Sequence, residues 1–281
     1  KRMPMHLYRR RVNSGKALAG MEKYEEDWIE RLFVARTQGW ILAFTEGGHC
    51  HFLPVLDLPE SGRSSRGQSV YSLLGGADRS DRIVAMVPVE ELEEEGRVLV
   101  FLSQGGQVKR TALEEFSNPR SGGIIAAGVK DGDRILDVML SDGTGEIMIL
   151  TREGRAIRFS EEDVPVQGRT AQGVKGIGLA DDDTVVGVAL LRRDAAVLTV
   201  TEDGSGKRTE VGEFPLQKRG GLGTLFSPSS GKLVPVVAAL EVVANDRVML
   251  ITAGGTTHQV GMDDLPLQGR RTQGRRLVKV A

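Results

Sequence analysis

The chain has 281 residues, of which 40% are hydrophobic, 27% are charged and 36 are glycine, which excludes a disordered chain and fits one large domain or two ordinary ones. No run approaches the roughly 18 apolar residues of a transmembrane helix, and a single cysteine, Cys50, excludes an internal disulfide framework. The net charge of −1 does not by itself indicate a nucleic-acid partner. Because the chain begins at Lys1 without a methionine or signal peptide, we expect a cytoplasmic piece of a longer protein with no membrane association.

A glycine-rich basic phrase recurs about every 50 residues, and we call each copy a box. Boxes 4, 5 and 6 share a proline followed two residues later by glutamine, and boxes 1 and 3 are weaker copies. The windows are box 1 (8–16), box 2 (62–68), box 3 (117–124), box 4 (166–176), box 5 (216–223) and box 6 (268–280).

A turn containing glycine precedes each box after the first, and a short apolar run precedes each turn. Such glycines supply the positive φ that tight hairpin turns need, and the runs are rich in β-branched residues typical of buried strands. The predicted turns are Gly47-Gly48, Gly105-Gly106, Glu153-Gly154, Asp203-Gly204 and Gly254-Gly255. The predicted strands are Trp40–Phe44, Ile83–Val87, Val98–Leu102, Ile135–Leu140, Ile147–Leu150, Val185–Leu191, Val197–Val200 and Val248–Ile251.

Six periods of about four strands each predict a single all-β domain over residues 1–281, a six-bladed β-propeller variant. The alternative is a pair of β-sandwiches whose similarity is accidental. A closed ring needs a strand from the termini, for which Lys1–Met5 and Leu277–Ala281 are the candidates. Helix propensity is concentrated at Glu22–Ile29 and Val89–Glu95, which we interpret as connections.

Charge is strongly separated between the boxes and the rest of the chain. The six windows hold 16 Lys and Arg and no Asp or Glu, which leaves 21 basic against 38 acidic residues elsewhere. Equivalent points of propeller blades lie on one ring, so the boxes predict a positive belt. Cations neutralise phosphates, and glycine lets backbone N–H groups approach an anion. Most boxes lack aromatic residues, which favours duplex DNA bound without sequence readout over single strands.

The alternative for the boxes is that they are ordinary polar turns. We predict instead that their side chains contact DNA phosphates. These residues are Arg9, Arg10, Arg11, Lys16, Arg63, Arg66, Arg120, Arg169, Lys175, Gln217, Lys218, Arg219, Gly220, Gly221, Arg270, Arg271, Arg275 and Arg276. Further basic residues follow the hairpin glycines, where they either border the belt or are solvated edge-strand charges. They are Lys109, Arg110, Arg155, Arg158, Lys207 and Arg208.

The sequence contains no convincing catalytic or metal-binding cluster. Ser14-Gly15-Lys16-Ala17 lacks the upstream glycine and the Ser/Thr of a phosphate-binding loop. His49-Cys50-His51 resembles a metal site, but adjacent strand residues point to opposite faces and two histidines alone do not bind zinc. Neither a catalytic residue nor a bound metal or cofactor is therefore expected. A propeller enzyme with a central site and a scaffold for protein partners remain as distant alternatives.

The boxes resemble a known family. Box 5 reads Gln217-Lys218-Arg219-Gly220-Gly221-Leu222-Gly223 and is similar to the hallmark heptad Gln-Arg-Arg-Gly-Gly-Lys-Gly of the C-terminal domain of the DNA gyrase A subunit. The opening stretch resembles the same family at Lys1–Pro4, Tyr8–Arg10, Glu25–Trp28 and Leu32–Ala35.

The resemblance implies a β-pinwheel, a propeller variant whose blades exchange strands, and a role in bending and wrapping DNA. It further implies that the domain is a non-catalytic part of an ATP-dependent type II topoisomerase. That enzyme would be an A₂B₂ assembly, in which the partners are the gyrase B subunit and a second A subunit, and it would use ATP and Mg²⁺ outside this domain.

One departure keeps an alternative open. The family carries its hallmark heptad in the first blade, but here Arg11–Ala17 matches it only at Gly15 and Lys16. A degenerate heptad is typical of the A subunit of topoisomerase IV, which relaxes and decatenates DNA. The equivalent domain of topoisomerase IV is therefore the main alternative.

Overall fold

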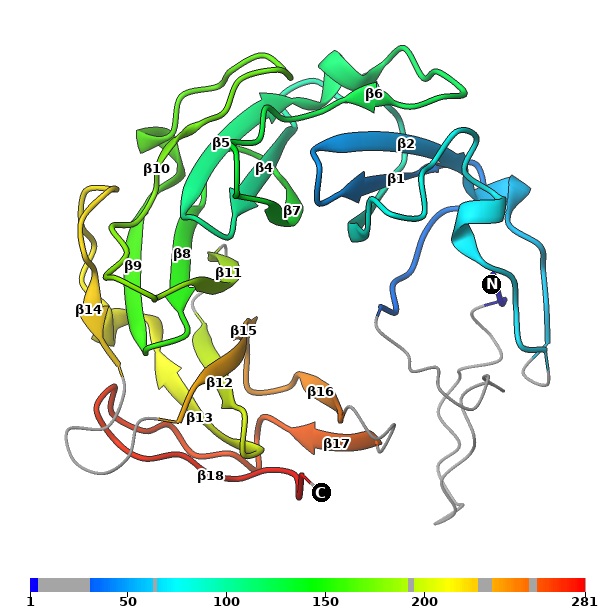
Figure 1. The fold of residues 1–281 in the computed structure, drawn as a ribbon. Coiled ribbons are helices and arrows are strands. Elements are labelled where there is room, and N and C mark those ends of the chain that lie inside the picture. Colours follow the sequence, from blue (N-terminus) through cyan, green and yellow to red (C-terminus); the bar gives the residue numbers. More distant parts are fainter. Residues whose placement is uncertain (5–30, 63–64, 192–194, 227–233, 253–256, 281) are drawn as a thin grey trace.

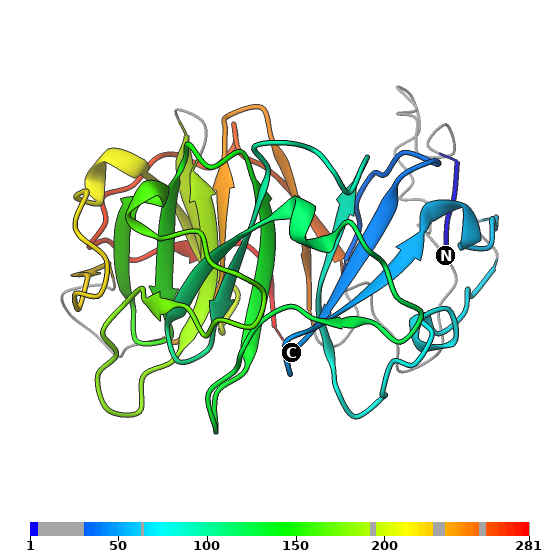
Figure 2. The same ribbon diagram turned by 90° about the horizontal axis from the view of Figure 1, so that it is seen from above.

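The fold is a ring-like arrangement of small β-sheets around a central axis, seen along that axis in Figure 1 and from the side in Figure 2. This computed structural model describes residues 1–4, 31–62, 65–191, 195–226, 234–252 and 257–280. Box 1 and the predicted turn at Gly254-Gly255 lie outside the described residues. The prediction of an all-β propeller architecture is confirmed.

Each blade is built on an antiparallel hairpin, and we number it by the box that follows the hairpin. The hairpins are β1 (Trp40–Thr45) with β2 (His49–Pro54) in blade 2, β4 (Val98–Ser103) with β5 (Gln107–Ala112) in blade 3, β8 (Glu146–Thr151) with β9 (Arg155–Ser160) in blade 4, β12 (Ala196–Thr201) with β13 (Ser205–Glu210) in blade 5, and β16 (Arg247–Ile251) with β17 (Thr257–Gly261) in blade 6.

The hairpin turns confirm the sequence prediction. The second turn residue of four hairpins has positive φ: Gly48 (84°), Gly106 (81°), Gly154 (78°) and Gly204 (79°). A side chain would also be excluded at Gly204, where a Cβ would lie 2.3 Å from the carbonyl oxygen of Val278. These turns fix the hairpin register and so align one blade with the next.

The inner edge of each complete blade is formed by a strand that follows the box. These inner strands are β3 (Ile83–Val89), β7 (Ile135–Ser141), β11 (Val185–Leu191) and β15 (Val236–Val242). They pair with β1, β4, β8 and β12 and contact one another around the axis. Because each sheet is covered on both faces by its neighbours, its central strand is apolar without alternation, as in β4, where all six residues are buried.

The outer edge of each complete blade belongs to the next repeat. A two-residue strand in the following repeat pairs with the outer hairpin strand: β6 (Ile124–Ile125) with β2, β10 (Val174–Lys175) with β5, β14 (Thr224–Leu225) with β9 and β18 (Arg275–Arg276) with β13. The four sheets therefore have the orders β3-β1-β2-β6, β10-β5-β4-β7, β11-β8-β9-β14 and β15-β12-β13-β18. This exchange is the arrangement that the family resemblance implied.

The core lies between blades. Between blades 2 and 3, the rings of Phe44 and Phe101 meet edge to face at 5.4 Å, and Phe116 packs against both. Phe214 and Phe226 form a similar pair 6.2 Å apart beside blade 4. Buried aromatic pairs of this kind add about 0.5–1.5 kcal/mol to the burial of their surface. This packing fixes the angle between neighbouring blades.

The sequence prediction for the connection at 90–97 is confirmed, whereas the prediction of closing strands at the termini is not. Residues 90–97 connect β3 to β4 without helix, as interpreted, whereas the connection at 22–29 lies outside the described residues. The predicted closing strands are wrong for the described terminal residues, because Arg2 forms only one parallel bridge, to Glu60, and residues 277–280 form no strand. The backbone N–H groups of Leu277 and Val278 instead donate to the carbonyl of Gly204 at the β12–β13 turn.

Candidate nucleic-acid interface

The boxes lie at the perimeter of the ring. We call the segment between an outer hairpin strand and the next inner strand an arm, and each arm carries one box. In arm 4 the chain passes Arg110 of β5 at Val166, loops outward through box 4, and returns to β5 as β10. Arms 5 and 6 repeat this path, with Arg158 bridged to Leu216 and Arg208 to Leu267. Each box is therefore an outward loop mounted on the preceding blade (Figure 1).

Successive arms bond to one another along the perimeter. Gly128 of arm 3 donates its backbone N–H to Ala171 of arm 4 at 3.1 Å, and Gly178 of arm 4 donates equivalently to Gly221 of arm 5 at 2.7 Å. Gly220 of arm 5 donates back to Gly176 at 2.6 Å. These bonds join arms 3, 4 and 5, and we call the outer surface formed by arms 2 to 6 the rim.

Two box glycines are required by the fold itself. Gly223 has a φ of +66°, and a Cβ there would lie 2.5 Å from the carbonyl oxygen of Ala156. Gly173 has a φ of +86° and would meet Val108 in the same way at 2.6 Å. By contrast, Gly221 is exposed and would meet only Ile157, at 3.8 Å. Close approach of backbone to backbone thus explains part of the glycine pattern that suggested anion binding.

Most predicted contact residues that the structure describes are exposed on the rim. These exposed cations are Arg66, Arg120, Lys175, Lys218, Arg271, Arg275 and Arg276. Four of the predicted residues, Arg9, Arg10, Arg11 and Lys16, lie outside the described residues, as does Arg63. The exposed set supplies positive charge along arms 2 to 6, which is the geometry that a phosphate backbone requires.

The arginine shared by boxes 4, 5 and 6 is half-buried and partly committed to structure. Arg219 donates from Nε to the carbonyl of Asp163 at 2.9 Å and from Nη1 to that of Lys175 at 3.0 Å. Arg270 donates from Nη1 to the carbonyl of Leu225 at 3.0 Å, the position equivalent to Lys175. These arginines join neighbouring arms, so only their remaining N–H groups could reach a phosphate. Arg169 is also half-buried at the same place in box 4.

Two further contacts restrain box 5. The amide of Gln217 donates from Nε2 to Thr224 Oγ1 at 2.8 Å, which closes the loop from inside. The ammonium of Lys218 lies 2.7 Å from Asp163 Oδ1, although the lysine side chain is 88% exposed. An exposed ion pair of this kind contributes little stability, so Lys218 can exchange Asp163 for a phosphate at small cost.

Acidic residues gather beside the rim rather than on it. The 3-10 turns η2 (Val55–Asp57), η4 (Leu113–Phe116), η5 (Glu161–Asp163) and η6 (Val211–Glu213) follow the outer hairpin strands. The connection at 90–97 lies at the same end of the sheets, because Leu113 donates to the carbonyl of Arg97 at 2.9 Å. Acidic side chains also stand at the opposite end of the sheets, where Asp81, Asp133 and Asp183 accept hydrogen bonds from the hairpin turns, so acidic residues flank the boxes at both ends.

Of the six basic residues after the hairpin glycines, Lys109, Arg110 and Lys207 are buried and the other three are half-buried, so they are not solvated edge-strand charges. Their strands β5 and β13 do border boxes 4 and 6, because β10 and β18 pair with them. Lys109 is 2% exposed, and Arg110 donates from Nε to the carbonyl of Val164 at 2.7 Å. Arg158 is also withdrawn, since it forms hydrogen bonds of 2.6 and 3.1 Å with Glu146. The arm of the next repeat covers these strands, which removes their edge from solvent.

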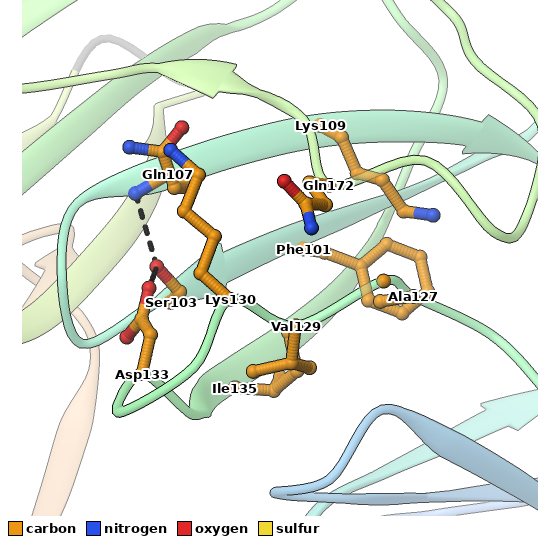
Figure 3. A pocket seen from close by; sticks show the side chains of 11 residues that line it. Phe101, Ser103, Gln107, Lys109, Ala127, Val129, Lys130, Asp133, Ile135 and Gln172 are labelled. Carbon is orange, nitrogen blue, oxygen red and sulfur yellow. Dashed lines mark hydrogen bonds between the residues drawn. The ribbon is translucent and has the colours of Figure 1, made fainter.

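The sequence pointed to Lys109 and Lys207 but did not predict that they are buried and bond the arms. Figure 3 shows Lys109 beside Phe101 and Gln172 at a small hollow between β5 and arms 3 and 4. Its Nζ lies 4.9 Å from the centre of the Phe101 ring. The available signal was the repeated spacing Gly106–Lys109 and Gly204–Lys207, which places both lysines at one position of the blade.

His49, Cys50 and His51 lie on one strand in different surroundings. His49 is exposed and its Nδ1 lies 3.0 Å from Asp81 Oδ2, whereas His51 is buried. Burial raises the pKa of the Cys50 thiol far above its ordinary value, so the sulfur is neutral. Across the described residues, no group of three His, Cys, Asp or Glu side chains could hold a metal ion.

No helix in the described part of the chain is long and apolar enough to cross a membrane.

A ring of strand-exchanged blades with a basic rim defines a β-propeller of the pinwheel type. The family described as "DNA gyrase C-terminal domain, beta-propeller" matches residues 40–90, 97–142, 145–192, 195–225 and 246–281. The chain belongs to this family. The five matched segments correspond to the repeats of blades 2 to 6.

Curated relatives agree with this assignment. The DNA gyrase A subunit of Salmonella typhimurium is 40% identical over 281 residues, and that of Halalkalibacterium halodurans is 44% identical over 281 residues. The match covers 100% of this chain but 32% and 34% of those proteins, so the chain spans about a third of their length.

Among solved structures, the DNA gyrase A C-terminal domain aligns with a TM-score of 0.80 at 21% identity over 98% of this chain and 90% of that chain. The C-terminal domain of DNA topoisomerase IV aligns with a TM-score of 0.78 at 25% identity over 86% of this chain and 76% of that chain.

Proposed function

We propose that this domain binds duplex DNA along its rim, without sequence specificity, and bends or wraps the duplex around the ring. The observation that carries the proposal is the position of the exposed cations on successive arms around the ring, in box windows that contain no Asp or Glu. A bent duplex lying on the rim would meet a cation of each arm in turn. Boxes 2 to 6 contain no aromatic residue on which a base could stack, so the contacts would be to phosphates.

The parent protein would be the A subunit of a DNA gyrase, an ATP-dependent type II topoisomerase. In that assembly the domain would act with the gyrase B subunit and a second A subunit, presenting a DNA segment for strand passage and negative supercoiling. The domain itself would supply no catalytic group, and ATP and Mg²⁺ would bind elsewhere in the parent enzyme. With a DNA partner of this kind, the protein would work in the bacterial cytoplasm, at the nucleoid.

A second candidate is the equivalent domain of the topoisomerase IV A subunit. The observation that favours it is box 1, where Arg11–Ala17 departs from the hallmark heptad and box 5 retains the better match. In that case DNA would bind and bend without a wrap of fixed hand. The curated relatives, which are named as DNA gyrase, make the gyrase assignment the stronger proposal.

The deciding experiment is to ligate nicked circular plasmid in the presence of the 281-residue chain and measure the linking number. A shift that grows with protein concentration supports a chiral wrap and the gyrase proposal, and its sign gives the hand of the wrap. Binding without a shift supports the topoisomerase IV alternative. Absence of binding at about 50 mM salt, where six to ten phosphate contacts should make affinity about 10³–10⁵ times higher than at 200 mM, would reject the proposal.

A further inference from the structure

Lys109 fastens two arms together from beneath the rim. Its Nζ donates to the carbonyl oxygens of Gly168 at 3.2 Å and Arg169 at 2.5 Å, both in box 4. It also donates to the carbonyl of Ala126 in arm 3 at 2.8 Å. A single buried ammonium therefore uses its three donors on three backbone carbonyls.

Lys207 repeats the arrangement two blades later. Its Nζ donates to the carbonyl oxygens of Arg270 at 2.5 Å and Thr272 at 2.7 Å in box 6, and to that of Phe226 at 2.8 Å in arm 5. Lys1 bonds box 2 similarly, at 2.9 Å to Gly62 and 2.5 Å to Ser65. The recurrence in three places shows that this is a repeated feature of the rim.

Blade 4 shows what the same position looks like without lysine. Ile157 occupies the strand position equivalent to Lys109 and Lys207, is fully buried, and lies beneath box 5. An apolar side chain therefore fits this position. Burying a charge costs free energy that burying isoleucine does not. Unlike isoleucine, the lysines bond the carbonyls of the box above them. These bonds fix the backbone that carries the box arginines.

We propose that Lys109 and Lys207 are positioning residues for DNA binding, whose ammonium groups hold boxes 4 and 6 in the conformation that presents their arginines to phosphates. This inference rests on the proposed DNA-binding function. The lysines do not touch DNA themselves, because the arms cover them.

The lysine ammonium groups face other cations and few anions. Burial, together with the charge of Arg169, lowers the pKa of Lys109 to about 8. Burial, together with Arg271 and Arg270, lowers the pKa of Lys207 to about 8. Lys130 and Asp133 line the hollow beside Lys109. Raising the pH through 8 deprotonates both ammonium groups. Because a neutral amine has only two N–H donors, one of the three carbonyls around each lysine then loses its hydrogen bond.

The test compares the double variant Lys109→Met and Lys207→Met with Ile157→Met in the 281-residue chain. Duplex DNA affinity at about pH 7 and hydrogen-exchange protection of each box are measured, with thermal melting as the check on folding. We expect the double variant to lose about tenfold in affinity, the order of one or two weakened phosphate contacts, and to lose protection only in boxes 4 and 6. Ile157→Met, which removes no donor, should change affinity less than about twofold.

A pH series on the unaltered chain tests the inference without any variant. Between about pH 7 and 9 DNA affinity should fall about fivefold while the melting temperature rises. The double variant should lose the affinity dependence and most of the rise in melting temperature, of which a part remains because burial also lowers the pKa of the Lys1 amino group. The inference would be overturned if the folded double variant bound DNA with unchanged affinity. It would also be overturned if affinity and melting temperature of the unaltered chain changed in the same direction with pH. If the unaltered chain does not bind duplex DNA at all, the proposed function fails. The hydrogen-exchange protection of boxes 4 and 6 would still show whether the lysines hold the boxes in place.

Discussion

Boxes 4 and 5 are neighbouring loops of the same design that are held in different ways. Box 4 lies over Lys109, whose ammonium bonds two of its carbonyls, while box 5 lies over Ile157 and is held by contacts from its own residues Arg219 and Lys218. The repeat therefore fixes where a box sits but not which groups fix its conformation. Box 6 combines both arrangements, because it lies over Lys207 while its own Arg270 bonds the carbonyl of Leu225 in arm 5.

The largest expected effect comes from box 6, which carries three exposed arginines, although one of them, Arg275, also donates to the carbonyl of Asp264. The triple variant R271A, R275A and R276A removes three exposed charges that we predict to contact phosphates. DNA affinity should fall about 10³-fold at about 0.1 M salt, and the slope of log affinity against log salt should decrease by about 2.7. Equilibrium binding of a duplex at several salt concentrations checks this. If the slope does not change, these side chains do not contact phosphates.

The buried lysines give the next effect, which concerns the pH dependence of stability. The folded pKa of Lys109 and Lys207 is about 8, below the 10.5 of an exposed lysine. Below pH 8 both states are protonated. Between pH 8 and 10.5 the unfolded chain binds more protons, so the free energy of unfolding should rise by up to about 3 kcal/mol per lysine.

Denaturant unfolding at about pH 7.5 and about pH 10 measures this rise. The double variant K109M and K207M should lose it, and Ile157→Met should retain it. An unfolding free energy that falls with pH in the unaltered chain would contradict the lowered pKa values.

A smaller effect on stability is expected from the box glycines. Gly223→Ala places a Cβ 2.5 Å from the carbonyl oxygen of Ala156 at a φ of +66°, which should destabilise the fold by about 2 kcal/mol or more. Gly221→Ala is the matched control in the same box, because its nearest neighbour, Ile157, is 3.8 Å away. Thermal melting distinguishes the two. Equal melting temperatures would show that box 5 relaxes freely around Gly223.

The smallest effect is expected at the exposed ion pair of box 5. Asp163→Asn removes the carboxylate that lies 2.7 Å from Lys218. Freed from this partner, Lys218 should bind phosphate more strongly, and duplex affinity should rise about two- to threefold at low salt with little change in melting temperature. Lower affinity in the Asp163→Asn variant would show that the pair orients Lys218 for DNA.

The comparison of the boxes also shows what the sequence could reveal. The hairpins were predictable because paired apolar runs and a turn glycine are local signals, and Gly48, Gly106, Gly154 and Gly204 all have the expected positive φ. The outward position of the boxes followed from the repeat. The burial of Lys109 could not be predicted, because the carbonyls that bond it belong to Gly168 and Arg169, some 60 residues further along the chain.

The sequence predicted one role, phosphate contact, for all arginines of the boxes, but the structure gives some of them a second role. Arg66, Arg271 and Arg276 are exposed as a DNA contact requires, but Arg219 and Arg270 also bond the backbone of the preceding arm. A pattern of Arg and Gly in a loop looks the same whether the guanidinium bonds a phosphate or a carbonyl. Only the path of the neighbouring arm distinguishes these two uses.

The exchange of outer strands has a consequence for synthesis of the chain. The sheet of blade 3 is completed by β10, which belongs to the repeat of blade 4, and the sheet of blade 5 by β18 near residue 276. As the ribosome releases the chain from its N-terminal side, each hairpin of blades 2 to 5 therefore keeps an open outer edge until 62 to 70 more residues emerge. Premature termination inside any repeat would expose the hairpin before it, so incomplete chains would carry an unpaired strand suited to aggregation or to recognition by chaperones.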